Sequence, residues 1–251
     1  HTTDCPPQSH DHIASSASNG TVVLWDVAAG RSGGQSVVWE AKDHSRTVWR
    51  LAWCQPGNEV LMLSGSLDGS IRAWDFRASC LCVMEMSKHH QQAAVRDLRV
   101  CGAEPWKFAA GLECSNEGAI AVWDVRNPGG PVVRVKEETA VHAVDWHPAH
   151  PTILASGRIG RQHAPAGVKI WDTSLGPSPS ATTASSTASS DLQPIAVLQT
   201  MDGVSNVMWR PTYRTQLATT YMTHLSTVHV WDIPTFWSPL AACCGHSMPV
   251  T

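Results

Sequence analysis

The stretch LSGSLDGSIRAWDF, residues 63–76, decides the fold of this 251-residue chain. Asp68-Gly69 separates two runs of alternating small and apolar residues, and the second run ends in Trp74-Asp75. Alternation with a period of two is typical of half-buried β-strands, and Asp-Gly is a strong hairpin-turn signal. The stretch therefore predicts a β-hairpin. Its serines, acids and tryptophan also raise the question of whether it is catalytic.

The Trp-Asp pair recurs along the whole chain. Its five copies follow each other at spacings of 49, 49, 48 and 60 residues, at Trp25-Asp26, Trp74-Asp75, Trp123-Asp124, Trp171-Asp172 and Trp231-Asp232. In a second register, Trp53, Trp146 and Trp209 each stand shortly before a proline. Such a period indicates an internal repeat, and four short strands in about 40 to 50 residues are typical of a β-propeller blade.

Residues 43–75 carry a family resemblance. DHSRTVWRLAWCQPGNEVLMLSGSLDGSIRAWD resembles a full WD40 repeat, with Asp43-His44 where the family has Gly-His, and CCGHSMPV resembles the start of another. The resemblance implies an all-β, WD40-type propeller with about five blades present of an expected seven, incomplete at both ends. We expect one propeller segment over residues 1–251, with blades at 1–40, 41–88, 89–136, 137–200 and 201–242, and 243–251 starting a further blade.

Composition sets limits on function. The formal charge of −3 is too balanced to suggest nucleic-acid binding, and no apolar run approaches the roughly 20 residues that span a bilayer. The eight cysteines form no CxxC pair, which favours buried thiols in a reducing compartment over a disulfide framework. The chain begins with His1, so we expect a segment of a longer protein with the remaining blades in flanking sequence.

The last spacing is long because it contains residues 173–191, TSLGPSPSATTASSTASSD. A Ser/Thr/Ala/Pro run cannot bury apolar surface, so we predict a disordered loop. It is either a tolerated expansion or a phosphorylated regulatory loop.

The resemblance also suggests roles for the polar residues around Asp68. It implies a buried structural hydrogen-bond tetrad of His44, Ser66, Asp68 and Trp74, in which the imidazole and turn amides serve the carboxylate and the indole N–H meets the hydroxyl. The alternative is a Ser/His/Asp hydrolase triad, which we disfavour because the serine lies on a strand and not on a nucleophile elbow. Other repeats have lost parts of the set, as expected for a structural device. We therefore predict a non-catalytic protein without cofactors.

The segment VHAVDWHPAHP invites a metal interpretation through His142, His147 and His150. No cysteine or acid converges on these histidines by spacing, so we predict loop and rim histidines and no metal site.

Function is then expected on the loops, in binding other proteins. The candidate surface includes Ser45, Arg46 and Thr47 before the first strand of the second unit, with residues 91–94 and 201–204 in equivalent places. Arg77 and Arg126 follow Trp-Asp pairs and resemble the Trp-Asp-x-Arg pattern that docks ubiquitin-ligase adaptors. Each arginine could instead cap the end of its strand.

The order of motifs, including VSNVMWRPTYRTQLATT before YMTHLSTVHVWDI, is similar to the RING-bearing WD-repeat subunit of SEA/GATOR-type complexes. The resemblance implies a scaffold that relays amino-acid sufficiency to the TOR kinase, with other WD-repeat subunits as partners. It also implies a cytoplasmic location, at the vacuole or lysosome through those partners and without insertion into the membrane. The alternative is a substrate-receptor propeller of a cullin-type ubiquitin ligase.

Overall fold

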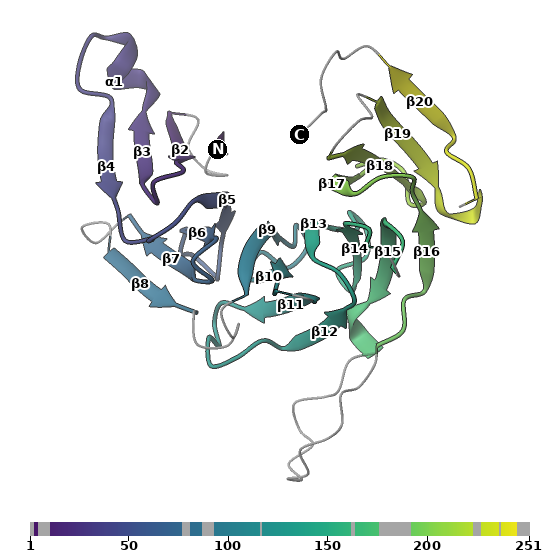
Figure 1. The fold of residues 1–251 in the computed structure, drawn as a ribbon. Helices are drawn as coiled ribbons and strands as arrows, with labels where there is room; N and C mark the ends of the chain where they lie inside the picture. The colour runs from purple at the N-terminus through teal and green to yellow at the C-terminus, as the bar shows by residue number, and fades with distance from the viewer. Residues whose placement is uncertain are drawn as a thin grey trace, which may run out of the picture.

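The computed structural model describes residues 3–4, 11–76, 81–86, 93–115, 117–161, 164–175, 192–222, 227–235 and 237–244. These residues form five antiparallel four-stranded sheets with almost no helix. The predicted all-β propeller architecture is confirmed, and Figure 1 shows the sheets as successive blades along an open arc. The number of blades in a closed ring stays a prediction.

Each blade takes four consecutive strands. The first blade contains β1 (Thr3–Asp4), β2 (His12–Ser16), β3 (Val22–Asp26), α1 (Val27–Arg31) and β4 (Val37–Ala41). The second contains β5 (Val48–Cys54), β6 (Leu61–Ser66), β7 (Ile71–Asp75) and β8 (Leu81–Glu85). The third contains β9 (Ala94–Val100), β10 (Lys107–Glu113), β11 (Gly118–Asp124) and β12 (Val133–Glu137). The fourth contains β13 (Val141–Trp146), β14 (Ile153–Arg158), β15 (Gly167–Asp172), the 3-10 helix η1 (Thr173–Leu175) and β16 (Ala196–Gln199). The fifth contains β17 (Val204–Trp209), β18 (Gln216–Tyr221), β19 (Thr227–Asp232), the 3-10 helix η2 (Ile233–Thr235) and β20 (Ala241–Cys244).

Two boundaries differ from the sequence prediction. β20 pairs with β19 through Thr227 and Cys244, so Cys243 and Cys244 belong to the fifth blade and do not start another. Residues 173–175, expected to be part of the disordered loop, instead form η1, and the Ser174 amide donates a hydrogen bond to Asp172. Residues 176–191 and 245–251 lie outside the described residues.

The strand beginning each blade is innermost, with β5, β9, β13 and β17 lining the inside of the arc (Figure 1). Apolar side chains fill the layers between neighbouring blades. Trp74 packs into the layer shared with the first blade, Trp123 into that shared with the second, and Trp171 and Trp231 follow the same rule. Each of these four tryptophans thus seals the contact with the preceding blade, where large aromatic side chains bury the most apolar area.

The aspartate of the pair has a different role. Its carboxylate accepts a hydrogen bond from a backbone amide two or three residues later, at Asp26 from Ala29, at Asp124 from Arg126 and at Asp172 from Ser174. Side chains that accept bonds from following amides stabilise turns and helix starts. The Trp-Asp pair therefore combines an inter-blade anchor with a turn cap, which explains its repetition without invoking catalysis.

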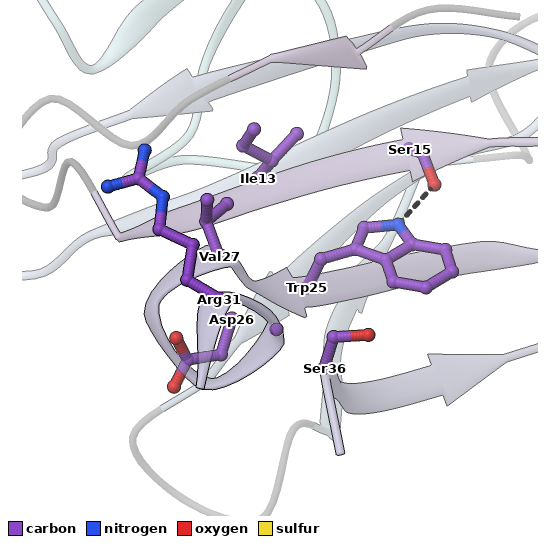
Figure 2. Close-up of a pocket in the computed structure, with 8 residues that line it drawn as sticks. Ile13, Ser15, Trp25, Asp26, Val27, Arg31 and Ser36 are labelled. Atoms are coloured by element: carbon purple, nitrogen blue, oxygen red, sulfur yellow. Dashed lines mark hydrogen bonds between the residues drawn. The ribbon is translucent and has the colours of Figure 1, made fainter. Parts of the chain in front are cut away.

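Trp25, in the first blade, lies on a face that no other described blade covers. It is half-buried and lines an open pocket of about 440 Å³ with Ile13, Val27 and Arg31 (Figure 2). Its indole N–H still donates to Ser15 Oγ at 2.7 Å. The hydrogen bond within the blade is therefore kept where the packing between blades is absent.

The six described cysteines are free thiols. Cys54 and Cys101 are buried as predicted, whereas Cys243 and Cys244 on β20 are exposed. No described helix is long or apolar enough to cross a membrane.

Candidate functional site

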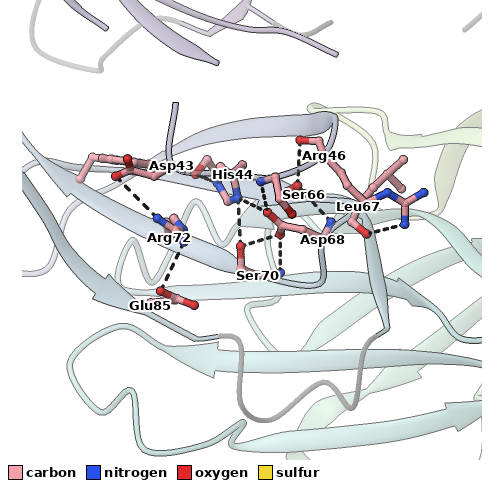
Figure 3. Close-up of polar contacts among 12 residues, drawn as sticks. Asp43, His44, Arg46, Ser66, Leu67, Asp68, Ser70, Arg72 and Glu85 are labelled. Atoms are coloured by element: carbon pink, nitrogen blue, oxygen red, sulfur yellow. Dashed lines mark hydrogen bonds and ion pairs between the residues drawn. The ribbon is translucent and has the colours of Figure 1, made fainter. Parts of the chain in front are cut away.

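A buried hydrogen-bonded chain connects the loop before β5 to the hairpin of β6 and β7 (Figure 3). The His44 side chain is completely buried, and its Nδ1 lies 3.1 Å from Asp68 Oδ2. Since an ionised carboxylate only accepts, Nδ1 carries the proton and donates to Asp68. Nε2 then accepts from Ser64 Oγ at 2.7 Å, and Ser64 Oγ accepts from the Trp74 indole N–H at 2.8 Å.

The serine in this chain is Ser64, so the prediction of Ser66 is wrong. Ser66 Oγ instead donates to the carbonyl of Arg46 and accepts from the Asp68 amide, which shapes the turn. The reason is strand register. Met62 lies opposite Trp74, and the residue two positions further on the same face, Ser64, comes within reach of the indole.

The same register identifies the indole partner in other blades. The pairs are Trp25 with Ser15, Trp171 with Ser156 and Trp231 with Thr219, at 2.7 to 2.9 Å. In the third blade Phe108 lies opposite Trp123, so the equivalent position is Ala110. A hydroxyl residue at this register position is the sequence signal that was missed.

Asp68 is the most heavily bonded group of the network. Besides His44, it accepts from the Ser45 amide at 2.9 Å, the Ser70 amide at 2.9 Å and Ser70 Oγ at 2.6 Å. Burial alone would raise the pKa of Asp68, but the hydrogen bonds from His44 and Ser70 outweigh burial and hold it well below its usual value. The positive φ of Gly69, +86°, allows the tight turn that brings these donors around the carboxylate.

Hydrogen bonds connect Ser64, His44 and Asp68 in the order found in hydrolase triads. Whether they could be catalytic therefore depends on whether a substrate can reach Ser64. Ser64 is fully buried, lies in the middle of β6, and its oxygen already accepts the Trp74 indole N–H. A substrate carbonyl cannot reach it without opening the blade. The geometry therefore supports a structural network.

In the fourth blade, Arg158 occupies the register position of Ser66, because Val141 faces Arg158 as Val48 faces Ser66. Arg158 lies 3.6 Å from Glu138, and the fully buried Glu137 carboxylate binds Lys169 Nζ at 2.7 Å. Burial raises the pKa of Glu137 even though Lys169 opposes the rise. At this position the fourth blade thus has an ionic cluster, which links it through Glu137 to β12 of the preceding blade, while the Trp171–Ser156 bond is kept.

The candidate partner residues of the second blade lie together beside the Asp68 turn. Ser45 and Arg46 are exposed and Thr47 is half-buried. Arg46 Nη1 donates to the Leu67 carbonyl at 3.2 Å, and Thr47 Oγ1 donates to the Ser18 carbonyl of the first blade at 3.1 Å. The side chains therefore hold this loop in place. In the other two candidate segments Met201 is fully exposed, whereas residues 91 and 92 lie outside the described residues.

Arg126 lies at the opposite end of its blade. Its guanidinium binds Asp124 through Nε and Nη2, at 2.6 to 3.2 Å, and stacks 4.5 Å from the Trp106 ring centroid. These contacts favour a strand-end cap over a free docking group, although the side chain is 53% exposed. Arg77, the other candidate docking residue, lies outside the described residues.

Of the three histidines of the metal hypothesis, His147 and His150 lie together, with ring centroids 4.8 Å apart. His147 Nε2 donates to the Arg214 carbonyl at 2.7 Å, and its Nδ1 accepts from the Ala149 and His150 amides. Burial, together with the nearby Arg96, lowers the pKa of His142 to about 4, so its imidazole is neutral. Among the described residues, no group of three or more His, Cys, Asp or Glu side chains is placed to hold a metal ion.

Comparison with known proteins agrees with this architecture. Residues 35–75 match the WD40 family model, "WD domain, G-beta repeat". A chain in the crystal structure of a mitotic checkpoint complex superposes with a TM-score of 0.71 at 20% identity, over 96% of this chain and 63% of that one. The chain therefore contains one segment that matches a WD40 repeat, and its fold is that of β-propeller blades.

Among named proteins, the chain is similar to the GATOR2 complex protein WDR24 of Danio rerio, with 30% identity over 93% of this chain. It spans only 27% of the length of that relative. It is also similar to the anaphase-promoting complex subunit cdc20 of Dictyostelium discoideum, with 27% identity over 94% of this chain and 41% of that protein. The predicted likeness to a GATOR-type WD-repeat subunit is thus confirmed as a similarity.

Proposed function

We propose that this chain is the propeller region of a non-catalytic scaffold subunit in a GATOR2-like complex that regulates TOR signalling in response to amino acids. The observation that carries the proposal is the similarity to WDR24 along 93% of the chain. The buried state of Ser64 supports the non-catalytic part, because a nucleophile sealed inside a blade cannot meet substrate.

Scaffolding suits the physical character of the blades. Four apolar layers and the hydrogen-bonded tryptophans fix the sheets, while the connecting loops stay at the surface. Partners are then other protein subunits, in the cytoplasm and at the vacuolar or lysosomal membrane through those subunits. No bound nucleic acid and no insertion into the membrane are required.

Depletion of the protein should blunt reactivation of the TOR kinase when starved cells are given amino acids, because the complex would lose a structural subunit. The measurement is phosphorylation of a TOR substrate during refeeding, with the full-length protein re-expressed as the rescue control. Normal reactivation in depleted cells would contradict the proposed role.

A substrate-receptor role in a ubiquitin ligase is the second candidate. The similarity to an anaphase-promoting complex subunit favours a ligase-related role in general. The cullin-type version relies on Arg77 and Arg126 as docking groups. Arg77 lies outside the described residues, and the contacts of Arg126 with Asp124 and Trp106 argue against a docking role for Arg126. We therefore rank the GATOR2-like scaffold first.

A further inference from the structure

The outer rim of the fifth blade has an exposed and uncharged surface. Residues 237–244, WSPLAACC, end in β20, the outermost strand of this blade (Figure 1). All eight residues are exposed, and the large side chains of Trp237 and Leu240 are exposed to 72% and 58%. The segment contains no charged residue, and we name it the rim segment. Exposed apolar segments of this kind mark sites of contact with other proteins.

The rim segment also presents the free edge of a sheet. The strand order is β17-β18-β19-β20, so in the part of the chain that the structure describes β20 pairs with β19 alone. The outer strands β8, β12 and β16 likewise pair with one strand each, although apolar layers cover both faces of their blades. Packing of blades against the faces of a sheet therefore leaves its outer edge free for another strand.

The exposure of β20 extends to the face that packs on the fourth blade. His229 lies on this face, because Trp231 belongs to the layer shared with the fourth blade and residues two apart in a strand point to the same side. Ala242 pairs with His229 and so shares the face, as does Cys244 two residues further on. Both are exposed all the same, so β20 projects beyond the contact between the two blades.

The absence of charge distinguishes β20 from other outer strands. Exposed charged residues lie on three of them, at Glu40 in β4, Glu85 in β8 and Lys136 in β12. Charged side chains protect an outer strand from pairing with a further strand. The fourth, β16, is uncharged, but Gln199 is its one exposed residue. Of the five described outer strands, β20 is thus the most open to edge pairing.

Symmetry favours a second copy of the same strand as the partner. When two copies of a strand pair in an antiparallel way, each residue comes near its own counterpart, so a charged strand repels itself. Self-pairing of β12 would bring Lys136 towards a second Lys136, whereas β20 consists of two alanines and two cysteines. The edge of β20 is therefore compatible with itself in charge and in size.

We propose that two copies of this protein associate by antiparallel pairing of β20 with its counterpart, which joins two four-stranded blades into one continuous sheet. Trp237 and Leu240 of each copy lie directly before the paired strand and add apolar contact. The interface is small, so the dimer is weak and reversible. This inference goes beyond the scaffold role, because it concerns contact between copies of the chain and not between different subunits.

The test traps the dimer through its own thiols. Cys243 and Cys244 are the exposed cysteines among the described residues, and the pairing brings them near their counterparts. The full-length protein is treated with copper phenanthroline, an oxidant that accepts the two electrons released when two thiols form a disulfide. We expect mass spectrometry to find the peptide of residues 243 and 244 linked to a second copy of itself. Mixing isotope-labelled with unlabelled protein shows that the link joins two molecules, and the Cys243→Ser/Cys244→Ser variant should lack it.

Charge exchange separates strand pairing from chance collision. The Ala241→Lys/Ala242→Lys variant places a lysine on each face of β20, so like charges meet across the pair and the yield of linked dimer should fall about fivefold. Ala241→Glu/Ala242→Glu should show the same loss alone, and an equal mixture of the two variants should recover the wild-type yield. Val38→Lys, at a 50% exposed position on β4, is the matched control and should link normally.

A wild-type protein that yields no self-linked peptide, or lysine and glutamate variants that fail to link with each other, would overturn the proposal. Equal yields for the wild type and the lysine variant would do the same, because the thiols would then react by random collision. Circular dichroism checks that each variant is folded. The experiment uses the purified protein alone, so its result does not depend on the assignment to a GATOR2-like complex.

Discussion

Replacing Trp74 by alanine should lower the free energy of unfolding by about 4 kcal/mol, the range measured for removing a buried tryptophan from a core. Trp74 is 1% exposed, packs edge-on against Trp39 of the first blade at a centroid distance of 5.0 Å, and donates its N–H to Ser64. The variant loses aromatic packing, leaves a cavity between two blades and removes a donor to Ser64. Chemical denaturation monitored by circular dichroism measures the loss.

Trp25 provides the matched control. It occupies the same repeat position and donates to Ser15, but it is half-buried beside an open pocket (Figure 2). In a chain of residues 1–251 alone, Trp25→Ala should therefore lower the free energy of unfolding by about 1 kcal/mol, mainly from its hydrogen bond and partial burial. Equal losses in the two variants would contradict the view that the tryptophan acts by sealing the layer to a preceding blade.

Asp68→Ala should lower the free energy of unfolding by about 3 kcal/mol, because the donors gathered around the carboxylate are left without an acceptor. These donors are His44 Nδ1, the Ser45 amide and the amide and hydroxyl of Ser70. The control is Asn19→Ala in the first blade. Asn19 is the equivalent turn residue and accepts a hydrogen bond from the Thr21 amide at 3.0 Å, so its replacement should lower the free energy of unfolding by about 1 kcal/mol. A wild-type melting temperature for Asp68→Ala would exclude a stabilising network.

The contribution of Asp68 should also depend on pH. Its pKa is lower in the folded protein than in the unfolded chain, so the folded state binds the proton less readily. The stabilisation is therefore complete above the unfolded pKa of about 4 and is lost progressively as the pH falls below it. The difference in unfolding free energy between wild type and Asp68→Asn should accordingly shrink on going from about pH 7 to about pH 3. A difference that stays constant would contradict the low pKa.

The Trp-Asp period predicted the fold because four of its tryptophans pack between blades and three of its aspartates accept from a following backbone amide. Trp74 and Trp171 anchor a blade to the one before it, and Asp26 and Asp172 cap the next turn. A side chain under such a constraint recurs at a fixed spacing, which makes it visible in one sequence without an alignment.

The repeat period could not show which serine belongs to the hydrogen-bond network. Ser64 and Ser66 lie two residues apart, so they share one face of β6, and a period of two cannot separate them. Only the pairing of Met62 with Trp74 shows which serine meets the indole. The β-bulges of β5, β9, β13 and β17 were missed for a related reason, since a bulge adds a single residue to one strand and does not disturb a repeat of 48 or 49 residues.

We propose that these blades form the propeller of a scaffold subunit in a GATOR2-like complex. The most direct test is affinity purification of the full-length protein, followed by quantitative mass spectrometry of the proteins that co-purify with it. We predict recovery of WD-repeat subunits related to GATOR2 components in stable amounts, with the same partner set for an Arg126→Gln variant. Recovery of anaphase-promoting complex subunits or a cullin-ligase adaptor in their place, particularly if lost in Arg126→Gln, would contradict the claim.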